Sequence, residues 1–363
     1  MIPPPNETTF NEINTLRGKL HSVQLPQDLL DKTSMMLDRT QAAIKFNGYY
    51  PGIDQVYNYI DLITSLPWFT RSQDTIDIPT VSSILDRNHF GLKGVKDRIL
   101  EYTAVLKLSK AFTNQANAKV DWSMRAPILL LVGLVGVGKT TLAISIAEAM
   151  GRKFIRLPFG GLGSAMELRG QSRVHADSEP GLIVKALRRA GTKNPVILFD
   201  EVDRVTDEAR ADIMGVLVEL MDPQQNNAFT DHYLDYPLDL SEVLFIATAN
   251  KTGGIAQAVL DRFEPIAMPV YNDLEKTTIA KQYLLPKVIA ASGLQPNQIA
   301  FEDAAWPNII RPIGYDAGMR TLERTLIGIC RKVARLVVEG QTQTIVITAQ
   351  NAKEFIHSDT NLY

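Results

Sequence analysis

The stretch APILLLVGLVGVGKTTLAISIAEAM (126–150) decides the fold of this 363-residue chain. The apolar run Ile128–Val132 predicts a buried strand, and Lys139–Met150 predicts a helix. Between them, Gly133–Thr140 fits the pattern G-x-x-x-x-G-K-[ST]. A strand, this turn and a helix in that order are the context in which the pattern binds nucleotide phosphates, so we interpret it as a phosphate loop.

The chemistry expected of this loop follows from its residue types. Glycines let backbone N–H groups turn toward phosphate oxygens, and the N-terminus of the helix adds a favourable dipole. The expected contacts to ATP are Gly133, Gly136, Val137, Gly138 and Thr141. Lys139 should reach the β- and γ-phosphates, and the Thr140 hydroxyl should bind Mg²⁺. The alternative is a glycine-rich turn that matches the pattern by chance.

Around this loop, strand-like and helical runs alternate along the chain. The expected strands are Ile128–Val132, Phe154–Leu157, Val196–Phe199, Val243–Ala247 and Pro265–Met268. The expected helices between them are Lys139–Met150, Gly181–Ala190 and Glu208–Met221. Short apolar strands joined by crossover helices predict an α/β domain, in which helices cover both faces of a parallel sheet.

Polar side chains follow two of these strands. The run VILFDE (196–201) ends in Asp200 and Glu201, and ligands of parallel sheets gather at the carboxyl ends of the strands. Asp200 should therefore hold Mg²⁺, and Glu201 should activate or orient the attacking water. A pair of acids in an exposed loop is the alternative. Asn250 could position the water, although an Asn at a strand end is usually a turn former.

Four regions are expected along the chain. They are an N-terminal helical bundle (1–68), a connector with an amphipathic helix (69–125), the α/β domain (126–270) and a mostly helical lid (271–363). The connector is expected to hold a short helix over Val81–Leu85, a helix over Gly94–Leu108 and a polar loop over Ser109–Arg125. The lid is expected to hold helices over Leu274–Ala291, Glu302–Ile310 and Ala317–Glu339, and a strand over Thr344–Thr348.

Composition narrows the classes of function. A formal net charge of -2 argues against a dedicated nucleic-acid binder, although a local basic patch is compatible with it. The single cysteine, Cys330, excludes an intrachain disulfide and lies in an apolar helical pattern, which favours burial. No apolar run approaches the roughly 20 residues that span a bilayer, and the first residues do not form a secretory signal. We expect no membrane partner and a cytoplasmic setting, or the mitochondrial matrix in a eukaryote.

Several stretches resemble the ATPase module of the Lon protease family, and the likeness covers nearly the whole chain. They are NHFGLKGVKDRILEYTAV (88–105), GRKFIRLPFGG (151–161), AGTKNPVILFDEVDR (190–204), LMDPQQNNAFTDHYLD (220–235), LFIATAN (244–250) and DAGMRTLERTLIGICRKVA (316–334). The three-helix start, with YIDLITSLPW (59–68), resembles the segment before that module. The resemblance implies a P-loop AAA+ domain of the α/β class, a helical lid and an N-terminal helical bundle.

The resemblance also implies roles for individual residues. Asn250 matches the first sensor, which contacts the γ-phosphate or its water, and Arg320 matches the second sensor, which ties the lid to the phosphates. Arg262 matches the arginine finger that reaches a neighbouring subunit's nucleotide in a hexameric ring. The segment His89-Phe90-Gly91 resembles the loop beside adenine. From the sequence alone, Arg262 could instead pair with Asp261 or Glu264, and Arg320 could belong to a solvated face with Glu323 and Arg324.

The chain departs from the family pattern in three places. It ends about where the Lon peptidase domain begins, so we expect this chain by itself not to cleave peptides. The large amino-terminal substrate-gathering domain of many Lon enzymes is missing as well. In the segment RGQSRVHADSEPG (169–181), His175 and Ala176 stand where the family places an aromatic and then an aliphatic residue to grip polypeptide. An aromatic ring grips through its area, so His175 is either a weak gripping residue or an ordinary surface residue.

The leading hypothesis is an ATP-driven ring motor that acts on unfolded or damaged proteins. The alternative is a non-proteolytic ATPase that remodels a specific partner or works as a nucleotide switch. A nucleic-acid motor is a third possibility, against which the nearly neutral charge and the Lon-like stretches both weigh.

Overall fold

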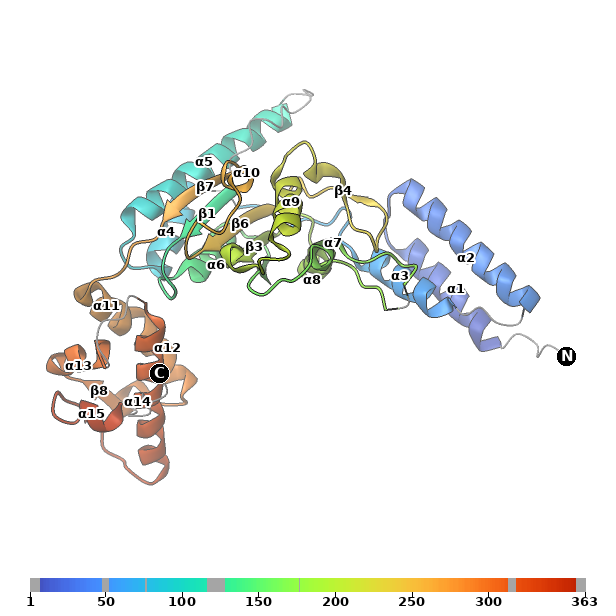
Figure 1. The fold of residues 1–363 in the computed structure, drawn as a ribbon. Helices are drawn as coiled ribbons and strands as arrows, with labels where there is room; N and C mark the ends of the chain where they lie inside the picture. The colour runs from blue at the N-terminus through green and yellow to red at the C-terminus, as the bar shows by residue number, and fades with distance from the viewer. Residues whose placement is uncertain are drawn as a thin grey trace. The chain divides into compact units, whose positions relative to one another are not determined.

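The computed structural model of the chain describes residues 7–47, 52–75, 77–115, 128–175, 177–312 and 318–356. The chain divides into two compact units (Figure 1). The first comprises Met1–Ile76, Val105–Leu130 and Ala147–Glu264. The second comprises Asp77–Ala104, Leu131–Ile146 and Pro265–Tyr363.

A five-stranded sheet forms the centre of the α/β part, with strand order β2-β3-β6-β1-β7. Its strands are β1 (Ile128–Val132), β2 (Phe154–Pro158), β3 (Val196–Asp200), β6 (Leu244–Ala249) and β7 (Phe263–Ala267). Strand β3 pairs in parallel with both β2 and β6. Every residue of β3 and β6 is buried, as expected for strands covered on both faces. The parallel sheet predicted from the sequence is confirmed, with strand ends shifted by up to two residues.

Helices follow the strands as the alternating pattern predicts. They are α6 (Lys139–Ala149), α7 (Met166–Arg169), α8 (Leu182–Ala190), α9 (Arg210–Met221) and α10 (Gln257–Leu260). Helix α8 buries its apolar residues and ends at Gly191, whose φ of 64° suits a residue without a Cβ atom. A short antiparallel pair, β4 (Phe229–Thr230) and β5 (Pro237–Leu238), lies between α9 and β6 in the chain.

Three helices form the N-terminal region, as expected. They are α1 (Glu7–Ser22), α2 (Gln27–Asn47) and α3 (Ile53–Ser65). Their apolar stripes face one another, and Leu20, Leu29 and Ile60 are almost fully buried. Burial of these stripes is what stabilises helices with modest intrinsic propensity.

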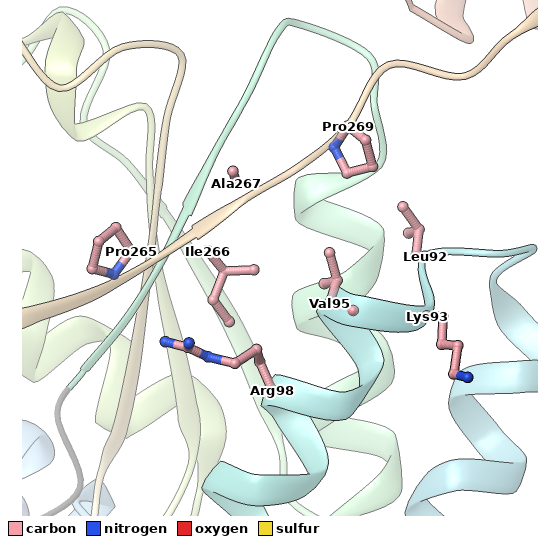
Figure 2. A pocket seen from close by; sticks show the side chains of 9 residues that line it. Leu92, Lys93, Val95, Arg98, Pro265, Ile266, Ala267 and Pro269 are labelled. Atoms are coloured by element: carbon pink, nitrogen blue, oxygen red, sulfur yellow. The ribbon is translucent and has the colours of Figure 1, made fainter.

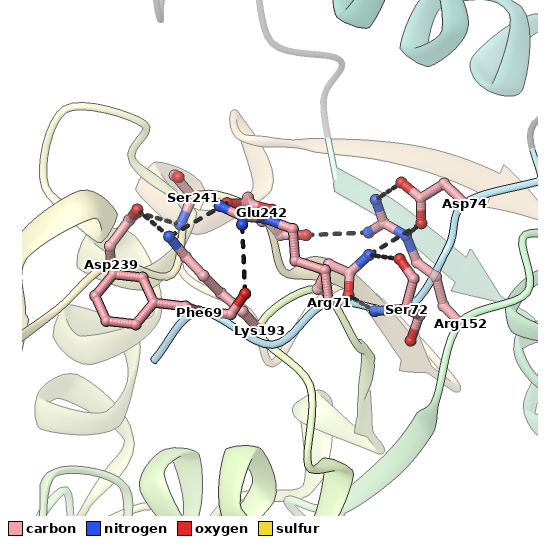
Figure 3. A network of polar contacts seen from close by, with 10 residues as sticks. Phe69, Arg71, Ser72, Asp74, Arg152, Lys193, Asp239, Ser241 and Glu242 are labelled. Atoms are coloured by element: carbon pink, nitrogen blue, oxygen red, sulfur yellow. Dashed lines mark hydrogen bonds and ion pairs between the residues drawn. The ribbon is translucent and has the colours of Figure 1, made fainter. Parts of the chain in front are cut away.

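Ion pairs hold the segment that follows α3, residues 69–75, against the sheet (Figure 3). Arg71 makes two hydrogen bonds to Glu242, of 2.6 and 2.8 Å. Arg152 holds Asp74 through two bonds of 2.8 Å, and both of these side chains are largely buried. Since Arg152 precedes β2 and Glu242 precedes β6, the segment is fixed at the amino ends of the parallel strands.

The second unit contains α4 (Ile78–Asn88) and the lid. The helices of the lid are α11 (Asp273–Ile279), α12 (Leu285–Ala291), α13 (Trp306–Ile310), α14 (Arg320–Val338) and α15 (Ala352–Phe355). Its strands β8 (Ile299–Phe301) and β9 (Ile345–Ile347) pair in parallel. Trp306, Leu326 and Cys330 belong to one apolar core. Burial raises the pKa of the Cys330 thiol to about 11, consistent with a packing role.

Three local predictions were wrong. Helix α5 spans Lys93–Gln115, so Ser109–Gln115 is not a loop; polar residues extend an existing helix more easily than they nucleate one. Residues 116–125, also predicted as loop, lie outside the described residues. A π turn over Ala280–Leu284 interrupts the helix predicted from Leu274, next to Pro286, which cannot donate a helical hydrogen bond. The third error is β8, whose three residues carry too little pattern to predict a strand.

The start of the third lid helix, predicted at Ala317, lies outside the described residues, and α14 begins at Arg320. Across the part of the chain that the structure describes, no helix has the length and apolar character needed to cross a membrane.

Candidate functional site

The phosphate loop has the backbone expected of a turn around an anion. Gly136 and Gly138 have φ angles of 84° and 96°, a region that residues with a Cβ atom rarely occupy. A Cβ atom at Gly133 would lie 2.8 Å from the carbonyl oxygen of Met268, so only glycine fits there. Helix α6 begins at Lys139, directly after the turn. The Lys139 ammonium is buried and donates to the carbonyl oxygens of Gly133 (2.6 Å) and Leu134 (3.0 Å).

The lid meets this loop at the start of α14, within the second unit. The N–H of Met319 donates to the carbonyl oxygen of Gly136 at 3.0 Å. A Cβ atom at Gly318 would lie 2.6 Å from the carbonyl oxygen of Val135, which shows how closely the two backbones approach. Arg320 is the first residue of α14, and its Cγ atom would lie 3.4 Å from a Cβ atom at Gly136. Arg320 therefore lies beside the phosphate loop.

The loop with His89, Phe90 and Gly91 is anchored on α6. The buried His89 ring lies 2.9 Å from the Ser145 hydroxyl through Nε2, and Lys96 donates to the His89 carbonyl oxygen at 2.7 Å. Burial, followed by the charge of Lys96, lowers the pKa of His89 to about 4. The imidazole is therefore neutral near pH 7, and its role in this structure is to fix the loop to α6.

An open groove of about 450 Å³ lies between the beginning of α5 and β7 (Figure 2). Its walls are mostly apolar, with Leu92 and Val95 on one side and Ile266 on the other. Lys93 and Arg98 are its charged lining residues. This groove could not be predicted from the sequence, because its walls come from segments far apart in the chain.

The acid Asp200 is held by two side chains in the first unit. Its carboxylate is almost fully buried and accepts a hydrogen bond from the Thr248 hydroxyl. The other carboxylate oxygen lies 2.6 Å from the guanidinium of Arg156, a half-exposed residue of β2. Neither Thr248 nor Arg156 was singled out in the sequence. In the sequence, each of these two residues is recognisable only as a polar residue within an otherwise apolar strand.

Glu201 has a backbone conformation that is unusual for its residue type. Its φ of 60° and ψ of 50° lie in the left-handed region, where residues other than glycine are uncommon. The Thr248 hydroxyl, which donates to Asp200, also accepts from the Glu201 N–H at 2.9 Å. The Glu201 carboxylate is part-exposed and lies 3.5 Å from Arg204. Thr248 thus fixes both acids at the end of β3.

Asn250 directly follows β6, the neighbour of β3 in the sheet. Its N–H donates to the buried carboxylate of Asp203 at 3.1 Å, and the N–H of Lys251 donates to the same carboxylate at 3.3 Å. Because β3 and β6 are parallel, Asn250 and Glu201 emerge at the same edge of the sheet, as predicted.

Arg262 lies after α10 and is about one-third exposed. It donates to the carbonyl oxygen of Ala258 at 2.8 Å, and its guanidinium lies 3.4 Å from the Asp222 carboxylate. Asp261, one of the partners considered for it, instead accepts a hydrogen bond from Gln257 at 2.6 Å.

The loop with His175 projects from a closed base. The N–H of Gln171 donates to the carbonyl oxygen of Glu179 at 3.0 Å. His175 is exposed, and Val174 is exposed by 87%. Ala176, the second residue predicted for this loop, lies outside the described residues.

Two family models match parts of this chain, and known proteins match nearly all of it. Residues 129–269 match the model "ATPase family associated with various cellular activities (AAA)", and residues 290–346 match "Lon protease AAA+ ATPase lid domain". The chain is 40% identical to Lon protease 2 of Thermus thermophilus over 95% of its own length and 42% of the relative's. It is 40% identical to Lon protease of Clostridioides difficile over 98% of its length and 44% of the relative's. The chain thus spans less than half the length of these relatives.

Proposed function

Because the chain carries the AAA+ ATPase module of the Lon family, we propose that it couples ATP hydrolysis to the unfolding and threading of polypeptides. The observation that carries the proposal is the hydrogen bond between Met319 and Gly136. It joins the lid directly to the phosphate loop, so a change in bound phosphate can move the lid. A ligand that binds the closed arrangement better than the open one shifts the population toward it.

The phosphate loop fits a nucleoside triphosphate. Gly136 and Gly138 turn the backbone without a side chain, and buried Lys139 supplies a positive charge at the start of α6. We propose that Lys139 contacts the β- and γ-phosphates, together with the backbone N–H groups of the loop. Arg320, beside the same loop, would contact the γ-phosphate from the lid.

We propose that a magnesium ion binds together with the nucleotide. In the described part of the chain no three His, Cys, Asp or Glu side chains gather as a metal cluster. A site with few protein ligands suits Mg²⁺, because this ion usually takes one or two ligands from the protein and the rest from phosphate and water. Thr140 and the buried Asp200 carboxylate would be those ligands. The ion would neutralise charge on the phosphates.

Glu201 is the proposed general base. Its carboxylate would accept the proton of the attacking water, and Asn250 would orient that water. The cost of the left-handed conformation, of the order of 1–3 kcal/mol, is offset locally by the hydrogen bond to Thr248.

We further propose that the chain works as a ring, with six subunits by analogy with the family. Arg262 would then leave Asp222 and reach the nucleotide of the next subunit. An arginine supplied in this way is worth roughly 10³–10⁵ in rate, so hydrolysis would depend on assembly.

Steady-state ATP hydrolysis with and without casein, an unfolded protein, tests the proposal. Casein should stimulate turnover, and Glu201→Gln should bind ATP but hydrolyse it hardly at all. The matched control is Glu208→Gln, which removes an exposed carboxylate from the same segment and should leave the rate unchanged. Turnover by Glu201→Gln at the wild-type rate would contradict the assignment of Glu201 as the general base.

A second candidate function is a partner-specific remodeller or nucleotide switch. The exposed His175, in place of an aromatic gripping residue, is the observation that favours it. Steady hydrolysis that casein leaves unchanged would support this function over the motor.

A further inference from the structure

The two oxygens of the Asp200 carboxylate have partners of different character. The Oδ1 atom accepts a hydrogen bond from the hydroxyl of Thr248, which is fully buried in β6. The Oδ2 atom is bound by Arg156, whose Nε and Nη2 atoms both lie 2.6 Å from it. In the part of the chain that the structure describes, Asp200 is the only acid that pairs with Arg156. The core of the sheet thus fixes one oxygen, and a surface side chain holds the other.

Arg156 reaches Asp200 from the edge of the sheet. Strand β2 is the outermost strand in the order β2-β3-β6-β1-β7, and Arg156 lies opposite Leu198, two residues before Asp200. Its side chain therefore extends toward the carboxyl end of β3. The Arg156 side chain is 53% exposed, whereas that of Asp200 is 6% exposed. A long side chain in this place can turn into water while the core stays closed, so the contact with Asp200 is reversible.

The Oδ2 atom cannot hold this guanidinium and a metal ion at the same time. Two nitrogen atoms of Arg156 already lie at hydrogen-bonding distance from it, and a carboxylate oxygen has only two lone pairs. Two cations on one oxygen would also repel each other strongly, because the repulsion grows as the distance shrinks. A buried carboxylate without a positive partner is costly, so the arginine stabilises Asp200 whenever the metal is away.

Resting on the proposed magnesium site, we propose that Arg156 exchanges with Mg²⁺ at the Oδ2 atom of Asp200. Arg156 is thereby a positioning residue that keeps the carboxylate in place and sets how tightly the site holds metal. Entry of the metal requires departure of the guanidinium, and the lost contact subtracts from the affinity for Mg²⁺ and for the nucleotide bound with it. The return of Arg156 to Asp200 favours the release of ADP after each turnover.

Calorimetric titration of the full chain with ADP measures this exchange in the absence of hydrolysis. The quantity compared is the metal effect, defined as the dissociation constant of ADP in EDTA divided by that in Mg²⁺. Arg156→Gln should raise the metal effect about tenfold, because the metal then displaces no charge-assisted hydrogen bond from a half-exposed arginine. The dissociation constant in EDTA should stay close to that of wild type.

Two further variants separate this role from a structural one. Arg156→Lys keeps a positive charge without the planar fork and should raise the metal effect less than Arg156→Gln. If Arg156→Gln does not fold, a metal effect of Arg156→Lys equal to that of wild type overturns the inference. The matched control is Arg71→Gln, since Arg71 is 51% exposed and lies 2.6 Å from Glu242 at the amino ends of the strands. Its metal effect should equal that of wild type, and a rise as large as that of Arg156→Gln would also overturn the inference.

Asp200→Asn distinguishes the exchange from the magnesium site on which it rests. This variant should remove most of the metal effect, and adding Arg156→Gln to it should change little, because both residues act on one contact. If Asp200→Asn lowers the metal effect but Arg156→Gln leaves it unchanged or lowers it, the exchange is refuted and the magnesium site stands. If Mg²⁺ does not tighten ADP binding by wild type, or Asp200→Asn leaves the metal effect unchanged, the magnesium site fails and the exchange fails with it.

Discussion

Replacement of Gly318 by alanine tests how the lid is coupled to the phosphate loop. The new Cβ atom would lie 2.6 Å from the carbonyl oxygen of Val135 and 3.4 Å from the Cα atom of Gly136. The free protein can relieve this clash by moving the segment away from the loop, which breaks the hydrogen bond from Met319 to Gly136. If Arg320 contacts bound ATP, binding has to return the segment with Gly318 to the phosphate loop. The clash of the new Cβ atom should then lower the affinity for ATP.

The magnitude follows from two terms. Overpacking costs roughly 1–3 kcal/mol, and a lost hydrogen bond costs about 0.5–1.5 kcal/mol. Because the free protein exchanges the clash for the lost hydrogen bond, the cost in affinity is the difference between the two terms. A difference of about 1–2 kcal/mol corresponds to a rise of roughly 5-fold to 30-fold in the dissociation constant of ATP.

Calorimetric titration with ATP and Mg²⁺ measures this change in the Glu201→Gln background, where hydrolysis should not interfere. The matched control is Gly215→Ala in α9, where a Cβ atom meets nothing within 4 Å. If Gly318→Ala folds and binds ATP within twofold of its parent, the lid contact does not contribute to nucleotide binding.

The remaining predictions concern the arginine finger, the support of the acids and the histidine on α6. Arg262→Ala should keep ATP affinity but lower the turnover of the assembled protein by roughly 10³-fold, and wild-type specific activity that is unchanged on dilution below assembly would contradict a role across subunits. Thr248→Val should lower turnover by about tenfold or more, because it removes the hydrogen bonds to Asp200 and from the Glu201 N–H, and Thr248→Ser should restore it. The pKa of His89 is lowered to about 4, so as the pH falls the unfolded chain binds a proton at His89 before the folded chain does. The contribution of neutral His89 to the unfolding free energy is therefore complete above about pH 6.5 and is lost as the pH falls toward 4. His89→Gln should flatten that part of the pH dependence of the unfolding free energy, and a pH dependence equal to that of wild type would refute the assignment.

The features predicted well from the sequence are those that a short local pattern determines. The strand at Ile128–Val132 and the helix that begins at Lys139 follow from apolar runs and from a motif of eight residues. The acids at the end of β3 follow from the same logic, because ligands of parallel sheets gather at the carboxyl ends of the strands. Local patterns do not show where a helix stops when polar residues continue it, and α5 is the example.

The contacts that organise the site could not be predicted, because they join segments distant in the chain. Arg156 reaches Asp200 only because β2 and β3 are neighbours in the sheet, an order that no local pattern encodes. The approach of Gly318 to Val135 is of the same kind. The hydrogen bond between His89 and Ser145 also joins distant segments, and the place of the His89 loop beside adenine stays a prediction.

ATP-dependent unfolding of a fluorescent protein that carries an unstructured tail, with Glu201→Gln as the blank, tests coupling to polypeptide most directly. If the chain threads polypeptide, fluorescence should fall with wild-type chain and ATP and stay constant with the blank. Constant fluorescence while ATP is being hydrolysed would contradict coupling to polypeptide and favour a partner-specific switch.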